Sequence, residues 1–166
     1  IQNRLLMIII NWFFTCLLLY ILLSISIEDI KTMLINEKKL RILGISGILY
    51  LLCLGISSNK INCIILLRNN LFSMLIVFLI MYLISYISYK VIRIDSLGMG
   101  DIKLSSYSSI WLGIEMSIIS LFISFMLSSI FSFYGKITNK FKTFHQYPFA
   151  PFLSIGIFCS WILDKI

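Results

Sequence analysis

Residues 5–27 read LLMIIINWFFTCLLLYILLSISI, an apolar run without a single charged side chain. A helix that crosses the hydrocarbon core of a bilayer needs about 20 mostly apolar residues, so this run is long enough to span a membrane. It is too long for the core of an ordinary signal peptide, and no small-residue cleavage site follows it. We therefore expect a retained membrane-spanning helix.

Further apolar runs follow along the rest of the chain. They are residues 42–57, 71–92, 102–113, 116–134 and 149–163. The runs at 42–57 and 102–113 are short for a span, and residues 61–67 either lie at the membrane interface or extend the third helix. We predict an all-α polytopic transmembrane helix bundle of about six spans, built as a single domain over residues 1–166.

The composition supports the same fold class. Hydrophobic residues make up 60% of the 166 residues, and the mean hydropathy is +1.00. Soluble domains are nearer 45–50% apolar, so the lipid bilayer must solvate part of this surface. None of the four cysteines forms a C-x-x-C pair, which argues against a zinc site or a disulfide framework.

The basic residues indicate the orientation in the membrane. The formal net charge is +7, but the bases form short clusters between apolar runs, which is typical of membrane topology and not of nucleic-acid binding. Ten of the 14 bases fall in the loops after spans one, three and five, so this side is predicted to be cytoplasmic. These ten are Lys31, Lys38, Lys39, Arg41, Lys90, Arg93, Lys103, Lys136, Lys140 and Lys142.

Two carboxylates, Asp29 and Asp101, fall on this cytoplasmic side. Asp29 follows the first span and Asp101 lies where the fourth begins, so the six-span topology places both at one depth. Ionisable groups at such a depth usually face a bundle interior or a water-filled cavity. Two close carboxyl groups can share one proton, and one then acts as base and the other as acid. Such a pair hydrolyses a peptide with activated water and needs no metal or cofactor.

Other interpretations of the two aspartates are open at this point. Each could be an ordinary helix-end carboxylate, and Asp101 could cap its helix, where the helix dipole favours negative charge. Aspartates at a membrane edge also bind cations or relay protons in small transporters and channel subunits. Topology alone therefore leaves catalysis, capping and transport as alternatives.

The local sequence around each aspartate favours catalysis. Residues 98–104 read G-M-G-D-I-K-L, in which Gly98 and Gly100 precede Asp101 and allow close backbone approach by an extended substrate. Residues 29–36 read D-I-K-T-M-L-I-N, and residues 148–153 read P-F-A-P-F-L at the start of the last span. A G-x-G-D string alone is weak, but the longer G-x-G-D-x-K-L string at the mouth of a span is much more specific.

These three segments resemble, in order, the signature segments of the prepilin peptidases, the G-x-G-D membrane aspartic proteases of bacteria and archaea. The resemblance extends over most of the chain and departs from the family pattern at Ile35, where the family has proline, and at Ala150, where it has glycine. It implies an aspartic endopeptidase with Asp29 and Asp101 as its catalytic pair. The implied substrates are prepilins or pseudopilins, whose short basic leader is removed at the cytoplasmic face of the plasma membrane.

The resemblance also sets expectations for neighbouring residues. Bifunctional relatives carry a C-x-x-C domain linked to N-methylation, so we expect no methyltransferase activity in this chain. Lys103 would contact substrate carbonyls or tune Asp101, or else be a positive-inside anchor, and Asn36 would bond within the first-aspartate loop, or else cap a helix. Glu28 and Asp95 are either solvated loop charges or carboxylates that recognise the basic leader. His145 is expected to be an interface residue.

Overall fold

The computed structural model describes residues 2–58, 60–93, 97–138 and 147–165. Within these residues the chain is all-helical and contains no strand. The helices are α1 (Gln2–Thr32), α2 (Glu37–Ser58), α3 (Lys60–Ile92), α4 (Met99–Ile137) and α5 (Ala150–Leu163). The prediction of an all-α fold is therefore confirmed.

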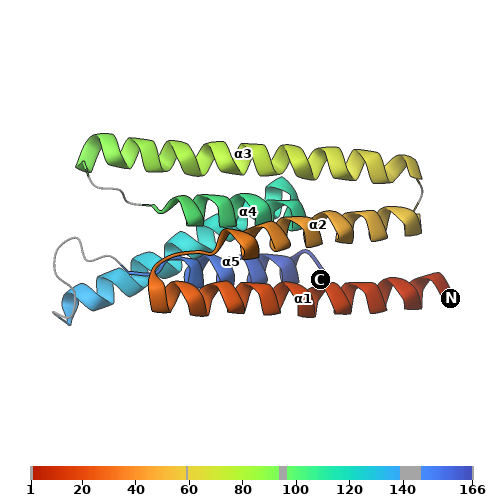
Figure 1. Ribbon diagram of the computed structural model, residues 1–166, viewed down its shortest axis with the longest axis horizontal. Helices are drawn as coiled ribbons and strands as arrows, with labels where there is room; N and C mark the ends of the chain where they lie inside the picture. The colour runs from red at the N-terminus through yellow and green to blue at the C-terminus, as the bar shows by residue number, and fades with distance from the viewer. Residues whose placement is uncertain (1, 59, 94–96, 139–146, 166) are drawn as a thin grey trace.

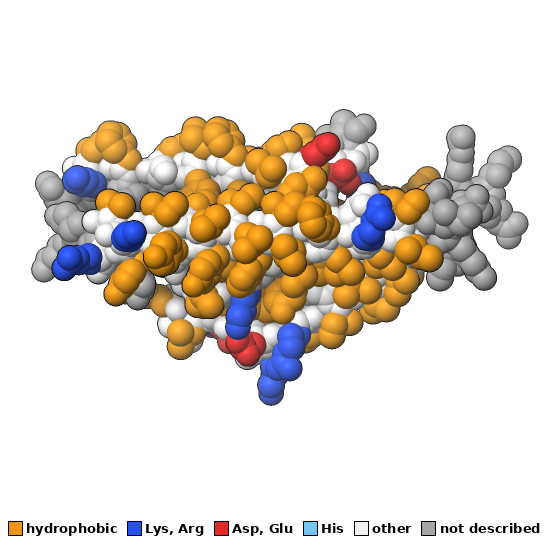
Figure 2. Space-filling model, turned by 90° about the horizontal axis from the view of Figure 1, so that it is seen from above, with side chains coloured by type: hydrophobic (Ala, Val, Ile, Leu, Met, Phe, Trp, Pro, Cys, Tyr) orange, Lys and Arg blue, Asp and Glu red, His pale blue; other side chains and the backbone are white. Residues whose placement is uncertain are grey.

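Three of these helices are long and apolar enough to cross a membrane. Among the described residues they are Met7–Thr32, Ile64–Val91 and Met99–Ile137, and Ala150–Leu163 is a shorter apolar helix. Figure 2 shows one face of the molecule covered mainly by hydrophobic side chains, with charged side chains at only a few places. An exposed apolar surface of this extent indicates a membrane protein, because a soluble monomer rarely exposes large apolar patches.

Helix α4 consists of two halves that meet at Gly113. This glycine has φ 72° and ψ −179°, whereas the residues on both sides are helical. That backbone conformation is open essentially only to glycine, which explains the residue type at the break. The chain turns back there, so residues 99–112 and residues 114–137 run in different directions (Figure 1). The break falls at the last residue of the span predicted at 102–113 and just before the span predicted at 116–134.

The first half of α4 forms the centre of the bundle. Most of its side chains are buried between the other helices, and Ile102, Leu104 and Ile110 are at most 1% exposed. Helix α3 lies along one side of it, while α2 and α5 pack on other sides (Figure 1). The residues at the two ends of this half-helix are consequently held by several neighbours at once.

An aromatic cluster packs around the far end of this half-helix. It is formed by Phe14 of α1, Tyr50 of α2, Trp111 of α4 and Trp161 of α5. The rings of Tyr50 and Trp111 are stacked at 5.5 Å, and Trp161 meets both edge-on. The Trp111 indole N–H donates to the Leu43 carbonyl at 2.9 Å, so this buried polar group is satisfied.

The structure corrects several predicted boundaries. The first two apolar runs were predicted at 5–27 and 42–57, but α1 continues to Thr32 and α2 begins at Glu37. Charged residues such as Glu and Lys form helices well, so α1 does not stop where its apolar run stops. Asp29 therefore lies on the last turn of α1 instead of beyond it. Residues 61–67 belong to α3, so of the two alternatives given for them the extension of the third helix is confirmed.

Candidate active site

The ends of four helices meet at one end of the bundle, which we call the aspartate end. Helix α1 ends there, and α2, α4 and α5 begin there (Figure 1). Asp29 lies on the last turn of α1, and Asp101 lies on the first turn of α4. Two residues that are far apart in sequence are thus brought to the same end of the molecule.

Asp29 is buried and held by the start of α5. Asp29 is only 5% exposed, and its Oδ2 accepts a hydrogen bond from the backbone N–H of Ala150 at 3.0 Å. Ala150 is the first residue of α5 and is fully buried. The first N–H groups of a helix have no partner within the helix and carry partial positive charge. The segment 148–153 therefore supplies Asp29 with a donor from the backbone.

Asp101 lies in a less satisfied environment. Its Oδ1 is buried and has no hydrogen-bond partner among the described residues, and its backbone N–H donates to Gly98 O at 3.1 Å. Asp29, also buried, lies at the same end of the bundle. Two carboxylates that repel one another in a buried site favour a state with one shared proton. This state provides one acid and one base.

The two glycines of the G-M-G-D segment have different surroundings. Gly98 is exposed and is the N-cap of α4, and a Cβ atom there would lie 3.3 Å from Asp101 Oδ2. At Gly100, a Cβ atom would lie 3.0 Å from the Cβ of Ile35 and 3.2 Å from its Cγ1 and Cδ1. Ile35 of the same chain therefore packs directly against Gly100, and the expected role of Gly100 in admitting substrate stays a prediction.

Lys103 and Asn36 are placed by the start of α2. Lys103 Nζ forms a salt bridge with Glu37 Oε1, which links α4 to α2. The hydrogen bond and the charge of Lys103 hold the pKa of Glu37 below its usual value. Asn36 Oδ1 accepts the N–H of Lys38 at 2.9 Å. Of the two roles considered for Asn36, the structure thus confirms helix capping.

Of the other three residues singled out in the sequence, Glu28, Asp95 and His145, only Glu28 lies among the described residues. Glu28 is paired with Lys39 at 2.9 Å, so it is not a freely solvated loop charge. Lys39 also donates to the Ser24 carbonyl at 2.9 Å, which fastens the start of α2 to α1. Asp95 and His145 lie outside the described residues, and their predicted roles stay predictions.

Three contributors to this site were missed by sequence reasoning. They are the Ala150 N–H, the Ile35 side chain and the Glu37 carboxylate. The P-F-A-P string did indicate a helix start, but no pattern in it says which carboxylate that start would meet.

Among the described residues there is no group of three or more His, Cys, Asp or Glu side chains that could hold a metal ion.

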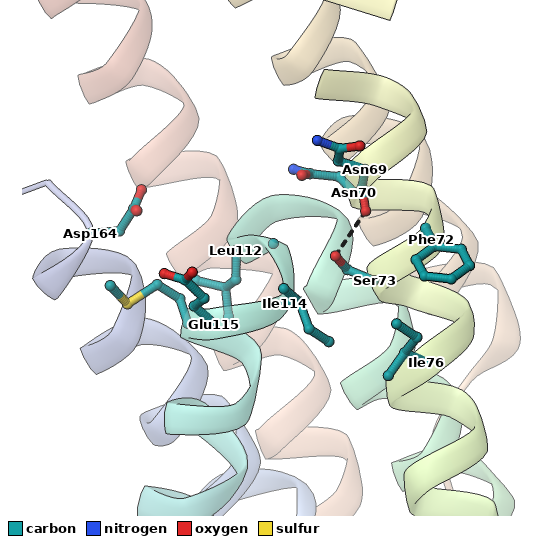
Figure 3. A pocket seen from close by; sticks show the side chains of 11 residues that line it. Asn69, Asn70, Phe72, Ser73, Ile76, Leu112, Ile114, Glu115 and Asp164 are labelled. Carbon is teal, nitrogen blue, oxygen red and sulfur yellow. Dashed lines mark hydrogen bonds between the residues drawn. The ribbon is translucent and has the colours of Figure 1, made fainter. Parts of the chain in front are cut away.

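A cavity lies at the other end of the first half of α4, beside Gly113. Its volume is about 440 Å³, and its lining includes Asn69 and Asn70 of α3, Glu115 of α4 and Asp164 (Figure 3). The Asn70 side chain donates to the Ile110 carbonyl at 2.8 Å, which satisfies a carbonyl left free by the break in α4. Gly113 lies twelve residues after Asp101, about 18 Å along a helix, so this cavity is separate from the aspartates.

Comparison with known proteins gives one match. The sequence model of the type IV leader peptidase family matches residues 16–133, which include both aspartates. No curated protein and no solved structure matches the chain.

Proposed function

The chain belongs to the type IV leader peptidase family, and we propose on this premise that it is an aspartic endopeptidase whose catalytic pair is Asp29 and Asp101. The observation that carries this proposal is that Asp29 on the last turn of α1 and Asp101 on the first turn of α4 both have buried carboxylate groups at the same end of the bundle. The family is one of membrane proteases, and the apolar helices agree with that setting.

The proposed mechanism uses water as the nucleophile. One aspartate, as the base, takes a proton from water as the water oxygen attacks the scissile carbonyl carbon, and the other, as the acid, gives its proton to the carbonyl oxygen. When the resulting tetrahedral intermediate breaks down, the C–N bond breaks, the leaving nitrogen takes the proton held by the first aspartate, and a hydroxyl proton of the intermediate returns to the second aspartate. The Ala150 N–H keeps Asp29 in one orientation during these steps, because a hydrogen-bonded carboxylate has fewer accessible rotamers. No covalent intermediate forms on the enzyme.

The proposed substrates are prepilins or pseudopilins with a short basic leader and a following hydrophobic helix. We place the aspartate end at the cytoplasmic face of the plasma membrane, because Lys31, Lys38 and Lys39 gather there with other bases. In this arrangement the polypeptide crosses the bilayer six times, with the halves of α4 as separate crossings. The hydrophobic helix of the substrate would lie in lipid, and its scissile bond would reach the depth of the aspartates.

Recognition of the basic leader by Glu28 is part of the proposal. Glu28 already pairs with Lys39, so a leader base would have to displace that lysine. Replacing Glu28 by Gln should then slow processing of a normal leader but not of a leader without Lys or Arg. Equal processing of both leaders by both enzymes would remove Glu28 from the recognition site.

The test of the proposed function is cleavage of a purified prepilin by the protein reconstituted in lipid. The wild type should release the leader, whereas Asp29→Ala, Asp29→Asn, Asp101→Ala and Asp101→Asn should each lower kcat by a factor of about 10²–10⁴ or more. An amide is the same size as a carboxyl group but cannot shuttle a proton.

The matched control is Glu115→Gln, which changes an exposed carboxylate just after the break in α4, away from the aspartate end. It should leave kcat unchanged. Full activity of either Asp→Asn variant would overturn the assignment of the pair. If the folded wild type left prepilin intact but passed cations across the bilayer, the transporter alternative would replace the peptidase.

A further inference from the structure

Four residues connect α1 to α2 at the aspartate end. We call this segment, residues 33–36, the connector. It begins with Met33, which has a positive φ of 52°, and it includes Ile35. The connector follows Asp29 by only four residues, and Gly100 directly precedes Asp101. Contact between the connector and Gly100 is therefore a short structural path between the two aspartates.

The contact itself is close. Ile35 is partly buried and packs against the hydrophobic core, and three of its side-chain carbons occupy the place of a side chain at Gly100. The nearest of them is Cβ, which cannot move away by rotation of the Ile35 side chain. Any group larger than hydrogen at residue 100 must therefore shift the connector backbone or the start of α4.

Two ionic contacts are made by the first turn of α2, which directly follows the connector. Lys39, just after it, pairs with Glu28 of α1 and donates to the Ser24 carbonyl. Glu37, at the start of α2, pairs with Lys103 of α4. The connector is thus tied to both helices that carry the aspartates and has little freedom to relax. A displacement at Ile35 would be passed on to the helices.

We infer that Ile35 is a positioning residue, which by packing on Gly100 sets the approach of Asp101 to Asp29. Gly100 has no side chain, and Ile35 packs against the position that a Cβ atom there would take. This inference rests on the proposed function for its consequence in catalysis, but the geometry that it predicts can be measured without any substrate.

The first experiment is a double-mutant cycle on prepilin cleavage. Gly100→Ala should lower kcat about 10-fold and Gly100→Val about 100-fold, because a 1 Å misplacement of reacting groups can lower a rate by about 10². In an Ile35→Gly background the obstruction is gone, so adding Gly100→Ala should lower kcat less than 2-fold further. Equal losses in both backgrounds would overturn the inference.

Gly44→Ala is the matched control for a general packing defect. A Cβ atom at Gly44 would lie 2.9 Å from Tyr107 Cδ1, an obstruction as severe as that at Gly100 but between α2 and the middle of α4. Ile35→Gly should not relieve any loss that Gly44→Ala causes. Relief of both glycine variants by Ile35→Gly would show a nonspecific effect and contradict the inference.

The second experiment measures the aspartate pair directly. In a variant with the four native cysteines replaced by serine, Asp29→Cys and Asp101→Cys are joined by a short bifunctional thiosulfonate, and the cross-linking rate is followed on gels. Gly100→Val should slow the reaction at least 5-fold, and Ile35→Gly should restore it. An unchanged cross-linking rate in Gly100→Val would overturn the inference. If the cross-linking rates changed as expected but the wild type did not cleave prepilin, the positioning role would stand and the proposed function would fail.

Discussion

The two ends of the first half of α4 differ in how their large side chains are packed and in whether their buried polar groups have hydrogen-bond partners. At the far end, Trp111 stacks on Tyr50, meets Trp161 edge-on and donates its N–H to the Leu43 carbonyl. At the aspartate end, Asp101 has a buried oxygen without a hydrogen-bond partner among the described residues, and Asp29 is buried as well. One end of the same half-helix is held by stacked aromatic rings and a satisfied indole N–H, and the other carries a buried carboxylate oxygen without a partner among the described residues.

This difference indicates where the stability of the bundle comes from. Buried aromatic rings contribute large contact area and favourable edge-on and stacked geometry, so the far end can fix the position of the helix. The aspartate end can then hold a group that would by itself destabilise the fold. Strain and unsatisfied groups of this kind are expected at functional sites, where activity is gained at the expense of stability.

Removing the aromatic anchor should have the largest effect on stability. Trp111→Ala loses the ring contacts and the hydrogen bond to Leu43, and it should lower the free energy of unfolding by about 3–5 kcal/mol. Trp111→Phe keeps a ring and should lower it by about 0.5–1.5 kcal/mol, because one hydrogen bond is lost while the Ser46 hydroxyl still donates to the Leu43 carbonyl. Denaturant-induced unfolding in detergent micelles, followed by circular dichroism, measures both. A loss below about 1 kcal/mol for Trp111→Ala would contradict the proposed anchoring role.

Removing the buried carboxylate at the other end should change stability in the opposite direction. Asp101→Asn removes the repulsion from Asp29 and should raise the free energy of unfolding by about 0.5–2 kcal/mol, while abolishing cleavage. The same unfolding measurement, paired with the prepilin assay, shows both effects. If Asp101→Asn destabilised the protein, Asp101 would have to be a structural residue, and the contrast between the two ends would disappear.

The smallest effect is a pH dependence at the start of α2. Lys103 lowers the pKa of Glu37 from its ordinary value of 4.5, so the pair stabilises the fold fully above that value. The contribution is lost as the pH falls through the lowered pKa. The effect should be small because Glu37 is exposed. The difference in unfolding midpoint between wild type and Glu37→Gln should shrink from pH 7 to pH 3, and a constant difference would contradict the pairing.

Much of the fold follows from hydrophobic pattern. The apolar runs predict the helical segments, and the separate runs at 102–113 and 116–134 correspond to the two halves of α4. Helix ends were less predictable: α1 extends through Asp29 to Thr32, beyond its apolar run. Helix formation depends on backbone hydrogen bonds and propensity as well as hydropathy, so hydropathy alone ends a helix too early.

The site could be predicted only in part. Motif reading identified Asp29 and Asp101, and topology placed them at one end. Their partners could not be found this way, because the Ala150 N–H and Ile35 reach the aspartate segments through tertiary packing over 121 and 65 residues of sequence, respectively. The Ile35 contact also gives Gly100 a packing neighbour within the chain itself.

The aromatic cluster bears on whether protons can leak across the membrane through the bundle. Carboxylates lie at one end of the central half-helix and a polar cavity at the other, so the bundle must not let protons pass between them. Between the ends, Ser105, Ser108 and Ser109 donate their hydroxyl protons back to carbonyls of their own helix, and Trp111 and Tyr50 close the path with stacked rings. Liposomes that contain the protein should therefore keep an imposed proton gradient as long as empty liposomes do. A rapid collapse of that gradient would show a conducting path through the bundle.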